Sequence, residues 1–188
     1  MATPSNSSRT ATTLLQQYAE YHRDRRNILT HFVGVPMIVF GVAVLLARPS
    51  VALAGFNVTL AGLVFALAAL WYLTRGALAL GAAVSASMGL LVWLAHGVSG
   101  GSVGHWLAWG LGFFGVGWVI QFIGHYYEGK KPAFADDLVS LLVGLLVGPM
   151  FVMMEGLAPL GLFKRLLRDV EAHAGATVLR DLAHPAVR

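Results

Sequence analysis

Hydrophobic and polar positions are segregated along this chain into long blocks. After a polar start, five apolar runs follow one another with short polar connections between them. The runs cover residues 28–47, 51–73, 76–98, 103–127 and 138–160. A helix of about 20 apolar residues crosses the ~30 Å hydrocarbon core of a bilayer. The pattern therefore predicts an all-α fold, a polytopic bundle of transmembrane helices.

Composition agrees with a membrane protein. The 188 residues are 57% hydrophobic and 12% charged, about half the charged fraction of a soluble domain. Glycine occurs 22 times, which suits close packing of helices in lipid. Cysteine is absent, so disulfides, thiolate metal sites and a cysteine nucleophile are excluded. The net charge of +4 indicates basic loops at one leaflet and no nucleic-acid partner.

The basic residues predict the orientation of the chain. With the N-terminus in the cytoplasm, most of the basic loop residues face inward, as the positive-inside rule prefers. These residues are Arg23, Arg25, Arg26, Arg75, Lys130 and Lys131. A full fifth span would place Lys164 outside, but Gly148-Pro149 interrupts that run, since proline removes a backbone donor. We expect four full spans plus a broken or re-entrant C-terminal segment, with five full spans as the alternative.

Three regions follow from the same pattern. Residues 1–12 are small and polar and are expected to be disordered. Residues 13–163 form one membrane domain, opened by a short amphipathic helix over 13–22, and residues 164–188 form a basic cytoplasmic tail. The expected location is a bacterial inner membrane. The sequence leaves the oligomeric state open.

Histidines stand where the first and fourth runs meet the cytoplasmic side. Ionisable groups at membrane depth are costly and commonly mark function. His31 opens the first run, His125 closes the fourth, and His22 lies just before the first. His22 and His31 are nine residues apart, about 2.5 turns at ~3.6 residues per turn, so on one straight helix their rings would face opposite ways. A bend in "HRDRRN", with Asp24 or Asn27 as the next N-cap, brings them together.

Polar side chains accompany these histidines at helical spacing. Gln121, His125 and Glu128 are four and three residues apart and form one stripe on a helix. Asn27 shares a face with His31 in the same way, and Tyr18 with His22. A glutamine one turn before a histidine can hold the ring or a bound ligand. Three neutral imidazoles with oxygen ligands suit a divalent first-row metal, but ligand type alone does not separate iron from zinc.

Simpler interpretations apply to each polar residue taken alone. A single histidine at a helix end is usually an interfacial or hydrogen-bonded residue, and we interpret His96 and His105, which flank the outer turn, in this way. Glu155 can form hydrogen bonds with backbone groups left unpaired near Pro149. Lys130 and Lys131 can contact lipid headgroups. The convergence of three histidines at one depth is what favours a metal.

Two long stretches and a short one carry a family resemblance. "YHRDRRNILTHFVGVP", "GWVIQFIGHYYEGKKPAFADDLV" and "GPMFVMMEG" resemble the membrane family that includes the fungal 2-hydroxy fatty acid dioxygenase of phytosphingosine breakdown. The resemblance runs from about Tyr18 to Phe163. One departure is the Arg23-Asp24-Arg25-Arg26 bend, where the fungal relatives often carry an Asn-Pro turn.

The resemblance implies an Fe(II)-dependent α-oxidation, in which a 2-hydroxy fatty acid reacts with dioxygen and loses its carboxyl carbon. Carried over residue by residue, it assigns the metal to His22, His31 and His125, with Glu155 or Glu128 as an additional ligand. It assigns catalytic roles to Gln121, Glu128 and Asn27. Substrate-binding roles go to Tyr18, Arg26, Lys130, Lys131 and Asp136.

Two other functions remain open at this point. A b-type haem protein would use two of the histidines as axial ligands and would show a Soret band. A non-catalytic lipid-binding or scaffold protein would keep its function after any of the histidines is replaced. A transporter is disfavoured, because no polar stripe crosses the full bilayer.

Overall fold

The computed structural model describes residues 10–130 and 138–182, with the backbone alone for 138–141. Its elements are α1 (Ala11–Ala19), α2 (Arg25–Ala47), β1 (Ser50–Leu53), β2 (Phe56–Thr59), α3 (Leu60–Leu73), α4 (Leu78–Val98), α5 (Val103–Glu128), α6 (Leu138–Leu157), the 3₁₀ turn η2 (Ala158–Leu160) and α7 (Lys164–Ala174). The predicted all-α polytopic bundle is confirmed. Lys131 and Asp136, two predicted substrate-binding residues, lie outside the described residues.

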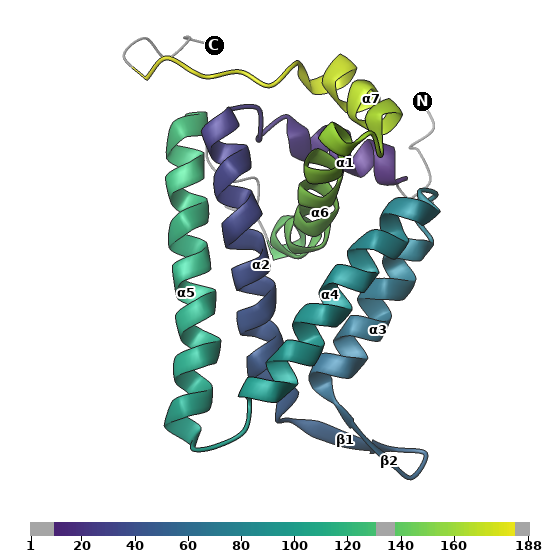
Figure 1. Ribbon diagram of the computed structural model, residues 1–188, viewed down its shortest axis with the longest axis vertical. Helices are drawn as coiled ribbons and strands as arrows, with labels where there is room; N and C mark the ends of the chain where they lie inside the picture. The colour runs from purple at the N-terminus through teal and green to yellow at the C-terminus, as the bar shows by residue number, and fades with distance from the viewer. Residues whose placement is uncertain (1–9, 131–137, 183–188) are drawn as a thin grey trace.

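The long helices run side by side and the short elements gather at the two ends (Figure 1). α1, α6 and α7 lie at one end, and the β1–β2 hairpin and the α4–α5 turn lie at the other. Within the described residues, four helical segments are long and apolar enough to cross a membrane: Arg25–Ala47, Leu78–Val98, Val103–Glu128 and Leu142–Leu160. The chain is therefore a membrane protein with its chain-terminal helices at one end of the bundle.

Glycines hold α2 and α5 close together. A Cβ atom on Gly41 would lie 2.6 Å from the backbone nitrogen of Phe114, and one on Gly117 would lie 3.0 Å from the carbonyl oxygen of Gly34. No side chain fits at these points, so the two backbones are in direct contact, as small residues allow in membrane bundles. This seam brings the N-terminal half of α2, which carries His31, against the C-terminal half of α5.

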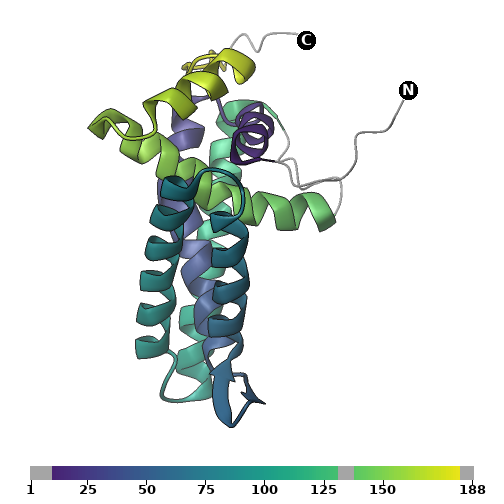
Figure 2. The ribbon, with the colours of Figure 1, turned by 90° about the vertical axis from the view of Figure 1, so that its right-hand side faces the viewer.

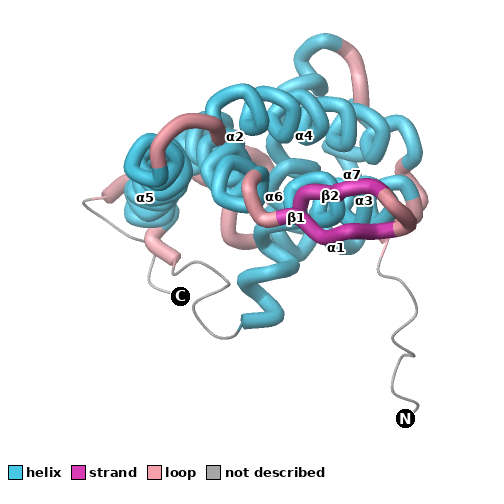
Figure 3. Tube along the Cα trace, turned by 90° about the horizontal axis from the view of Figure 1, so that it is seen from below, coloured by secondary structure: helices cyan, strands magenta, loops and turns pink. Residues whose placement is uncertain are grey.

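The second apolar run differs from its prediction. Residues 50–59 form an antiparallel hairpin, in which Ser50 pairs with Thr59 and Leu53 with Phe56 (Figure 3). Ala54 and Gly55 between the strands both have positive φ, 50° and 85°, which matches a tight two-residue turn. The predicted helix start at residue 51 is wrong, and α3 begins at Leu60. Its 14 residues extend about 21 Å, less than the hydrocarbon core.

The last apolar run also differs, because α6 continues through Pro149. The predicted break is absent from this described helix. The Tyr72 hydroxyl donates a hydrogen bond of 2.9 Å to the Leu146 carbonyl in the turn before the proline. α6 nonetheless lies across the long helices, as Figure 2 shows. It is therefore not a fifth helix parallel to the others.

The terminal helices pack on each other at the same end of the bundle. α1 begins at Ala11, two residues before the predicted start, and the Thr10 side chain caps it. The Gln16 amide donates to the Asp169 carbonyl of α7 at 3.2 Å. Buried Leu15 of α1 and Phe151 of α6 belong to a core cluster built by α1, α2, α3, α4, α6 and α7. This core supports the bend between α1 and α2.

Candidate metal centre

A tight bend between α1 and α2 carries His22. The His22 backbone N–H still donates to the Ala19 carbonyl at 3.0 Å, and two residues later Asp24 caps α2 by accepting from the Arg26 N–H at 2.8 Å. The chain reverses within this short distance. The rings of His22 and His31 consequently face each other with centroids 4.5 Å apart. Of the two predicted caps, the structure selects Asp24.

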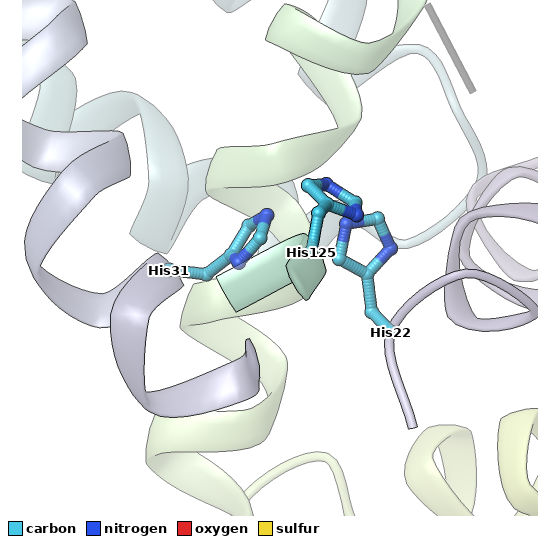
Figure 4. Close-up of side chains that lie close together, drawn as sticks. All are labelled: His22, His31 and His125. Carbon is cyan, nitrogen blue, oxygen red and sulfur yellow. The ribbon is translucent and has the colours of Figure 1, made fainter. Parts of the chain in front are cut away.

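Three histidine rings meet at this end of the bundle. His125 on α5 lies 4.9 Å from His22 and 5.5 Å from His31, between ring centroids, and Figure 4 shows the rings turned toward one another. All three are buried. One ligand atom from each lies within 4.8 Å of the others. Metal–nitrogen bonds of about 2.0–2.1 Å place the ligand atoms ~3–3.5 Å apart, so the side chains would move together by about 1 Å to complete a site.

Backbone carbonyls fix the orientation of two of the rings. His22 Nδ1–H donates to the Tyr18 carbonyl at 2.6 Å, and His31 Nδ1–H donates to the Asn27 carbonyl at 2.8 Å. A carbonyl only accepts, so these bonds select the tautomer that leaves an Nε2 lone pair for a ligand. Metal-binding histidines commonly carry this type of support.

Two buried ring nitrogens are left without partners. His22 Nε2 and His125 Nδ1 have no hydrogen-bond partner among the described residues. An unpaired buried polar group costs about 1–3 kcal/mol, which a bound metal ion would recover. Burial lowers the pKa of His22 well below its ordinary value, and the neighbouring His31 and His125 lower it further. The ring is therefore neutral at pH 7, the form that binds a metal.

Tyr18 lies flat against the His22 ring. The two rings stack with centroids 3.9 Å apart and an interplanar angle of 1°. Burial raises the pKa of the Tyr18 hydroxyl above its ordinary value, so the group stays protonated and can donate a hydrogen bond. Tyr18 thus both restrains His22 and offers a neutral donor at the site.

Glu128 on α5 stabilises the bend by accepting hydrogen bonds from its backbone. Its Oε2 accepts hydrogen bonds from the backbone N–H groups of Arg23 at 2.9 Å and Asp24 at 2.7 Å. The Asn27 amide donates to the same oxygen at 3.2 Å and to the Tyr21 carbonyl at 3.1 Å. Since Glu128 is one turn after His125, it ties α5 to the bend. Glu128 and Asn27, predicted as catalytic, hydrogen-bond to each other and to the bend and do not line the cavity described below.

A cavity opens beside the three rings, between α2, α5 and α6. Its empty space, mouth included, is about 580 Å³. Tyr18 and Gln121 are the other polar side chains in its wall. The remaining lining residues are Val35, Ile38, Val39, Trp118, Gly144, Leu145, Gly148 and Pro149. Gln121 is 5% exposed, and its Oε1 has no hydrogen-bond partner in the described part of the chain. The wall is therefore polar at the histidines and apolar elsewhere.

Comparison with known proteins settles the family. Residues 8–157 match the Mpo1-like family, described as "2-hydroxy-palmitic acid dioxygenase Mpo1-like". The chain belongs to the Mpo1-like family. It is 32% identical over 157 residues to the 2-hydroxy-palmitic acid dioxygenase MPO1 of Saccharomyces cerevisiae, covering 82% of this chain and 83% of the yeast protein. No solved structure matches the chain. The resemblance inferred from the two motif stretches is confirmed.

Glu155 does not join the histidines in this Mpo1-like chain. Its carboxylate accepts a hydrogen bond of 2.9 Å from the Arg23 guanidinium, and it is not part of the three-histidine group. Arg23, which is 3% exposed, also donates from Nε to the His22 carbonyl at 2.9 Å. The predicted additional ligand is thus engaged in an ion pair that supports the bend.

The predicted substrate-binding cations that the structure describes are also engaged elsewhere. Arg26 pairs with Asp24 at 2.8 Å, and its guanidinium lies 4.5 Å from the Tyr127 ring centroid. Lys130 donates to the Glu20 carbonyl at 2.7 Å. Neither side chain lines the cavity, whose described wall contains no arginine, lysine, aspartate or glutamate. Arg26 and Lys130 therefore lie near the site but outside the cavity wall.

A C-terminal strap, residues 175–180, crosses the bend and was not foreseen from the sequence. The Arg25 N–H donates to the Val178 carbonyl at 2.8 Å, and the Val178 N–H donates to the Arg23 carbonyl at 2.9 Å. The strap lies beyond residue 157, where the family match ends. No local pattern signals this contact, because its partners are more than 150 residues apart in the sequence.

Arg180 at the end of the strap joins two carboxylates. Its guanidinium pairs with Glu128 at 2.7 Å, and its backbone N–H donates to Asp24 Oδ2 at 2.8 Å. Burial opposes ionisation of Asp24, but hydrogen bonds from Arg26 and Arg180 outweigh it and lower the pKa of Asp24 to about 2. The strap therefore braces the segment that carries His22.

Proposed function

We propose that this chain is a membrane dioxygenase that converts 2-hydroxy fatty acids into fatty acids one carbon shorter, with Fe(II) as its metal. The observation that carries the proposal is the group of three buried imidazoles, two with unpaired nitrogens, beside an apolar cavity. The reaction type is proposed by analogy with the yeast relative, a 2-hydroxy-palmitic acid dioxygenase.

The residues present fit a divalent metal. His22, His31 and His125 would hold it through neutral nitrogens, and Fe(II) in this position supplies the redox chemistry that activates dioxygen. Because Glu155 is paired with Arg23, we propose an all-histidine set in place of the two-histidine, one-carboxylate arrangement. Three neutral ligands leave the full charge of the dication uncompensated, which favours an anionic substrate.

The cavity suits the head of a 2-hydroxy acid. Its carboxylate and hydroxyl oxygens can both reach one metal ion, and the metal balances the negative charge in a wall without cationic side chains. The Tyr18 hydroxyl and the Gln121 amide are the neutral groups placed to orient these oxygens. The apolar remainder of the wall accepts the start of the acyl tail.

The overall reaction balances without a further reductant. The bond between the carboxyl carbon and the hydroxyl-bearing carbon breaks, and one 2-hydroxy acid with one dioxygen gives the shorter acid, carbon dioxide and water. The role of the protein is to position these groups and to exclude bulk water. The burial of all three histidines serves the second purpose.

The alternatives fit the geometry less well. The three rings touch edge to face at 4.5–5.5 Å between centroids, so a porphyrin would not fit between any two of them. A non-catalytic scaffold gives no reason for buried, unpaired imidazole nitrogens. The b-type haem protein would still be recognised by a Soret band, and the scaffold by a function that survives loss of the histidines.

We further propose that the metal site faces the cytoplasm of a bacterial cell. At the site end, the backbone N–H of Ala11 donates to the Arg75 carbonyl at 2.9 Å, so the α3–α4 turn lies with the basic bend. At the other end, Arg48 donates to the Ser99 carbonyl at 2.7 Å. This distribution of basic residues agrees with the positive-inside rule. The basic tail from residue 164 would lie on the cytoplasmic side.

Metal analysis of detergent-purified protein, followed by oxygen uptake with 2-hydroxypalmitate, tests the proposal. We expect about one iron per wild-type chain and substrate-dependent uptake, and loss of both in His125→Ala. His105→Ala, at the opposite end of the bundle, serves as the control and should keep both. If His125→Ala retains metal and uptake, His125 is not part of the site and the proposal fails.

A further inference from the structure

The cavity extends from the histidines toward the middle of the bundle. On α2 its wall runs from His31 through Val35 to Val39, and on α5 it runs from His125 through Gln121 to Trp118. Eight residues along α2 correspond to about 12 Å at 1.5 Å per residue. The polar groups lie at one end of this path, and the far end is apolar. The cavity therefore has a head end and a tail end.

Gly148 and Gly144 on α6 both line the cavity, and they differ in how much space surrounds them. A Cβ atom on Gly148, near the head end, would lie 3.3 Å from the Tyr18 hydroxyl oxygen and 3.5 Å from Val35. A Cβ atom on Gly144, one turn earlier, would meet no atom of the described residues within 4 Å. Gly148 is buried, whereas Gly144 and Leu145 are half-buried. The wall is thus closed at Gly148 and open at Gly144.

The surface around the opening is apolar and exposed. On α5, Val119 is 58% and Phe122 is 52% exposed, and on α6, Leu142 is 54% exposed. These residues belong to two of the segments long and apolar enough to cross a membrane. Such exposed side chains in a membrane protein face lipid acyl chains. The opening at Gly144 therefore leads sideways into the hydrocarbon layer.

We propose that the 2-hydroxy fatty acid enters sideways from the bilayer between α5 and α6, and that its tail leaves the site past Gly144. The inference rests on the proposed function, which supplies the acid. Gly144 is then a specificity-determining residue, because its missing side chain keeps the passage open. Only the head and the first ~12 Å of the acid lie inside the protein, and the rest of a long tail stays in lipid.

Substitution of Gly144 tests the passage. Gly144→Leu adds a side chain where nothing lies within 4 Å, so the helix should fold and the protein should keep its metal. Gly115→Leu is the matched control, since Gly115 on α5 also has no atom within 4 Å of an added Cβ and does not line the cavity. The readout is kcat/KM for oxygen uptake with 2-hydroxypalmitate and with 2-hydroxyhexanoate.

We expect Gly144→Leu to lower kcat/KM at least tenfold for the long acid and less than threefold for the short one, while Gly115→Leu changes neither. An unchanged ratio of kcat/KM between the two acids, with or without an equal loss for both, would overturn the proposal.

Photolabelling separates the passage from the reaction. A 2-hydroxypalmitate probe with a diazirine in the middle of its tail should label α2 near Val39, α5 near Trp118 or α6 near Leu145 in wild-type protein, and much less in Gly144→Leu. Labelling confined to α1 or α7 would overturn sideways entry. The expected labelling in a protein that consumes no oxygen would support the passage while rejecting the proposed function.

Discussion

Both ends of the bundle carry histidines that are anchored to backbone carbonyls. The two ends differ in whether the second ring nitrogen has a hydrogen-bond partner. His22 at the site end and His96 at the other end make the same anchor, donating from Nδ1 to the carbonyl four residues earlier, at 2.6 Å and 2.8 Å. At His96 the second nitrogen accepts a hydrogen bond of 3.0 Å from the Thr59 hydroxyl. At the site end, His22 Nε2 is buried with no partner among the described residues.

The comparison shows which observation distinguishes a candidate ligand from a structural histidine. Backbone anchoring occurs at both ends, so it does not identify a metal site. Among the described residues, convergence and burial of histidines occur at the site end only, because His96 and His105 are both exposed. His96 and His105 consequently provide matched controls within the same chain.

Removal of a histidine at the site end should have the largest effect. We expect His22→Ala, His31→Ala and His125→Ala to lose bound iron and to lower oxygen uptake more than ~100-fold, beyond the range for residues that only support a ligand. Metal content per chain and uptake with 2-hydroxypalmitate measure this. His96→Ala and His105→Ala should match wild type in both, and loss of iron in either would erase the distinction between the ends.

Loss of Glu128 should be the next largest effect. Glu128→Ala leaves the Arg23 and Asp24 N–H groups and the Arg180 guanidinium without their acceptor, so the bend that carries His22 loosens. We expect iron affinity to fall about 10–100-fold, measured by competition with a chelator, with partial rescue in Glu128→Gln. Glu20→Gln, which alters the exposed pair with His173, is the control. A wild-type affinity in Glu128→Ala would contradict a positioning role.

Asp24 should make the site end sensitive to acid. Its pKa is about 2 in the folded chain, against an ordinary value of 3.8, so its stabilisation is present above about pH 4 and is lost as pH falls toward 2. Asp24→Asn should therefore be about 2 kcal/mol less stable than wild type at pH 6, and the gap should shrink to about 1 kcal/mol at pH 2.5. Unfolding of metal-free protein in detergent measures both gaps, with Asp169→Asn on α7 as control. A gap independent of pH would refute the ion-pair account.

Weakening the strap should give the smallest effect. Val178→Pro removes the N–H group that donates to the Arg23 carbonyl, a loss of about 1 kcal/mol and hence about fivefold in iron affinity. Val178→Ala keeps that N–H group and should resemble wild type. If both variants bind iron equally well, the strap does not brace the bend.

Much of the architecture follows from the sequence because apolar runs and helix caps are local signals. The positions of α2, α4 and α5 follow from run length, and the bend follows from the nine residues between His22 and His31 together with the capping aspartate. The hairpin at 50–59 was missed because its residues are as apolar as a helix, although Gly55, between segments that carry the β-branched Val51, Val58 and Thr59, is a turn signal.

Long-range partners explain the remaining differences. Pro149 does not end α6, and Tyr72 from another helix donates its hydroxyl to the Leu146 carbonyl in the preceding turn. The family resemblance assigned Glu155 to the metal and Arg26 to the substrate, yet Glu155 pairs with Arg23 and Arg26 pairs with Asp24. The strap at Val178 and Arg180 depends on contacts between the two ends of the sequence. Such pairings are set by the packing of the whole bundle and leave no periodic pattern.

X-ray absorption at the iron K-edge of reconstituted wild-type protein tests the central claim most directly. Multiple scattering from imidazole rings counts the histidines bound to the metal. The account predicts three, falling to two in His125→Ala if iron is forced in at high concentration, and three in His105→Ala. A spectrum with one imidazole or none would contradict a centre built by His22, His31 and His125.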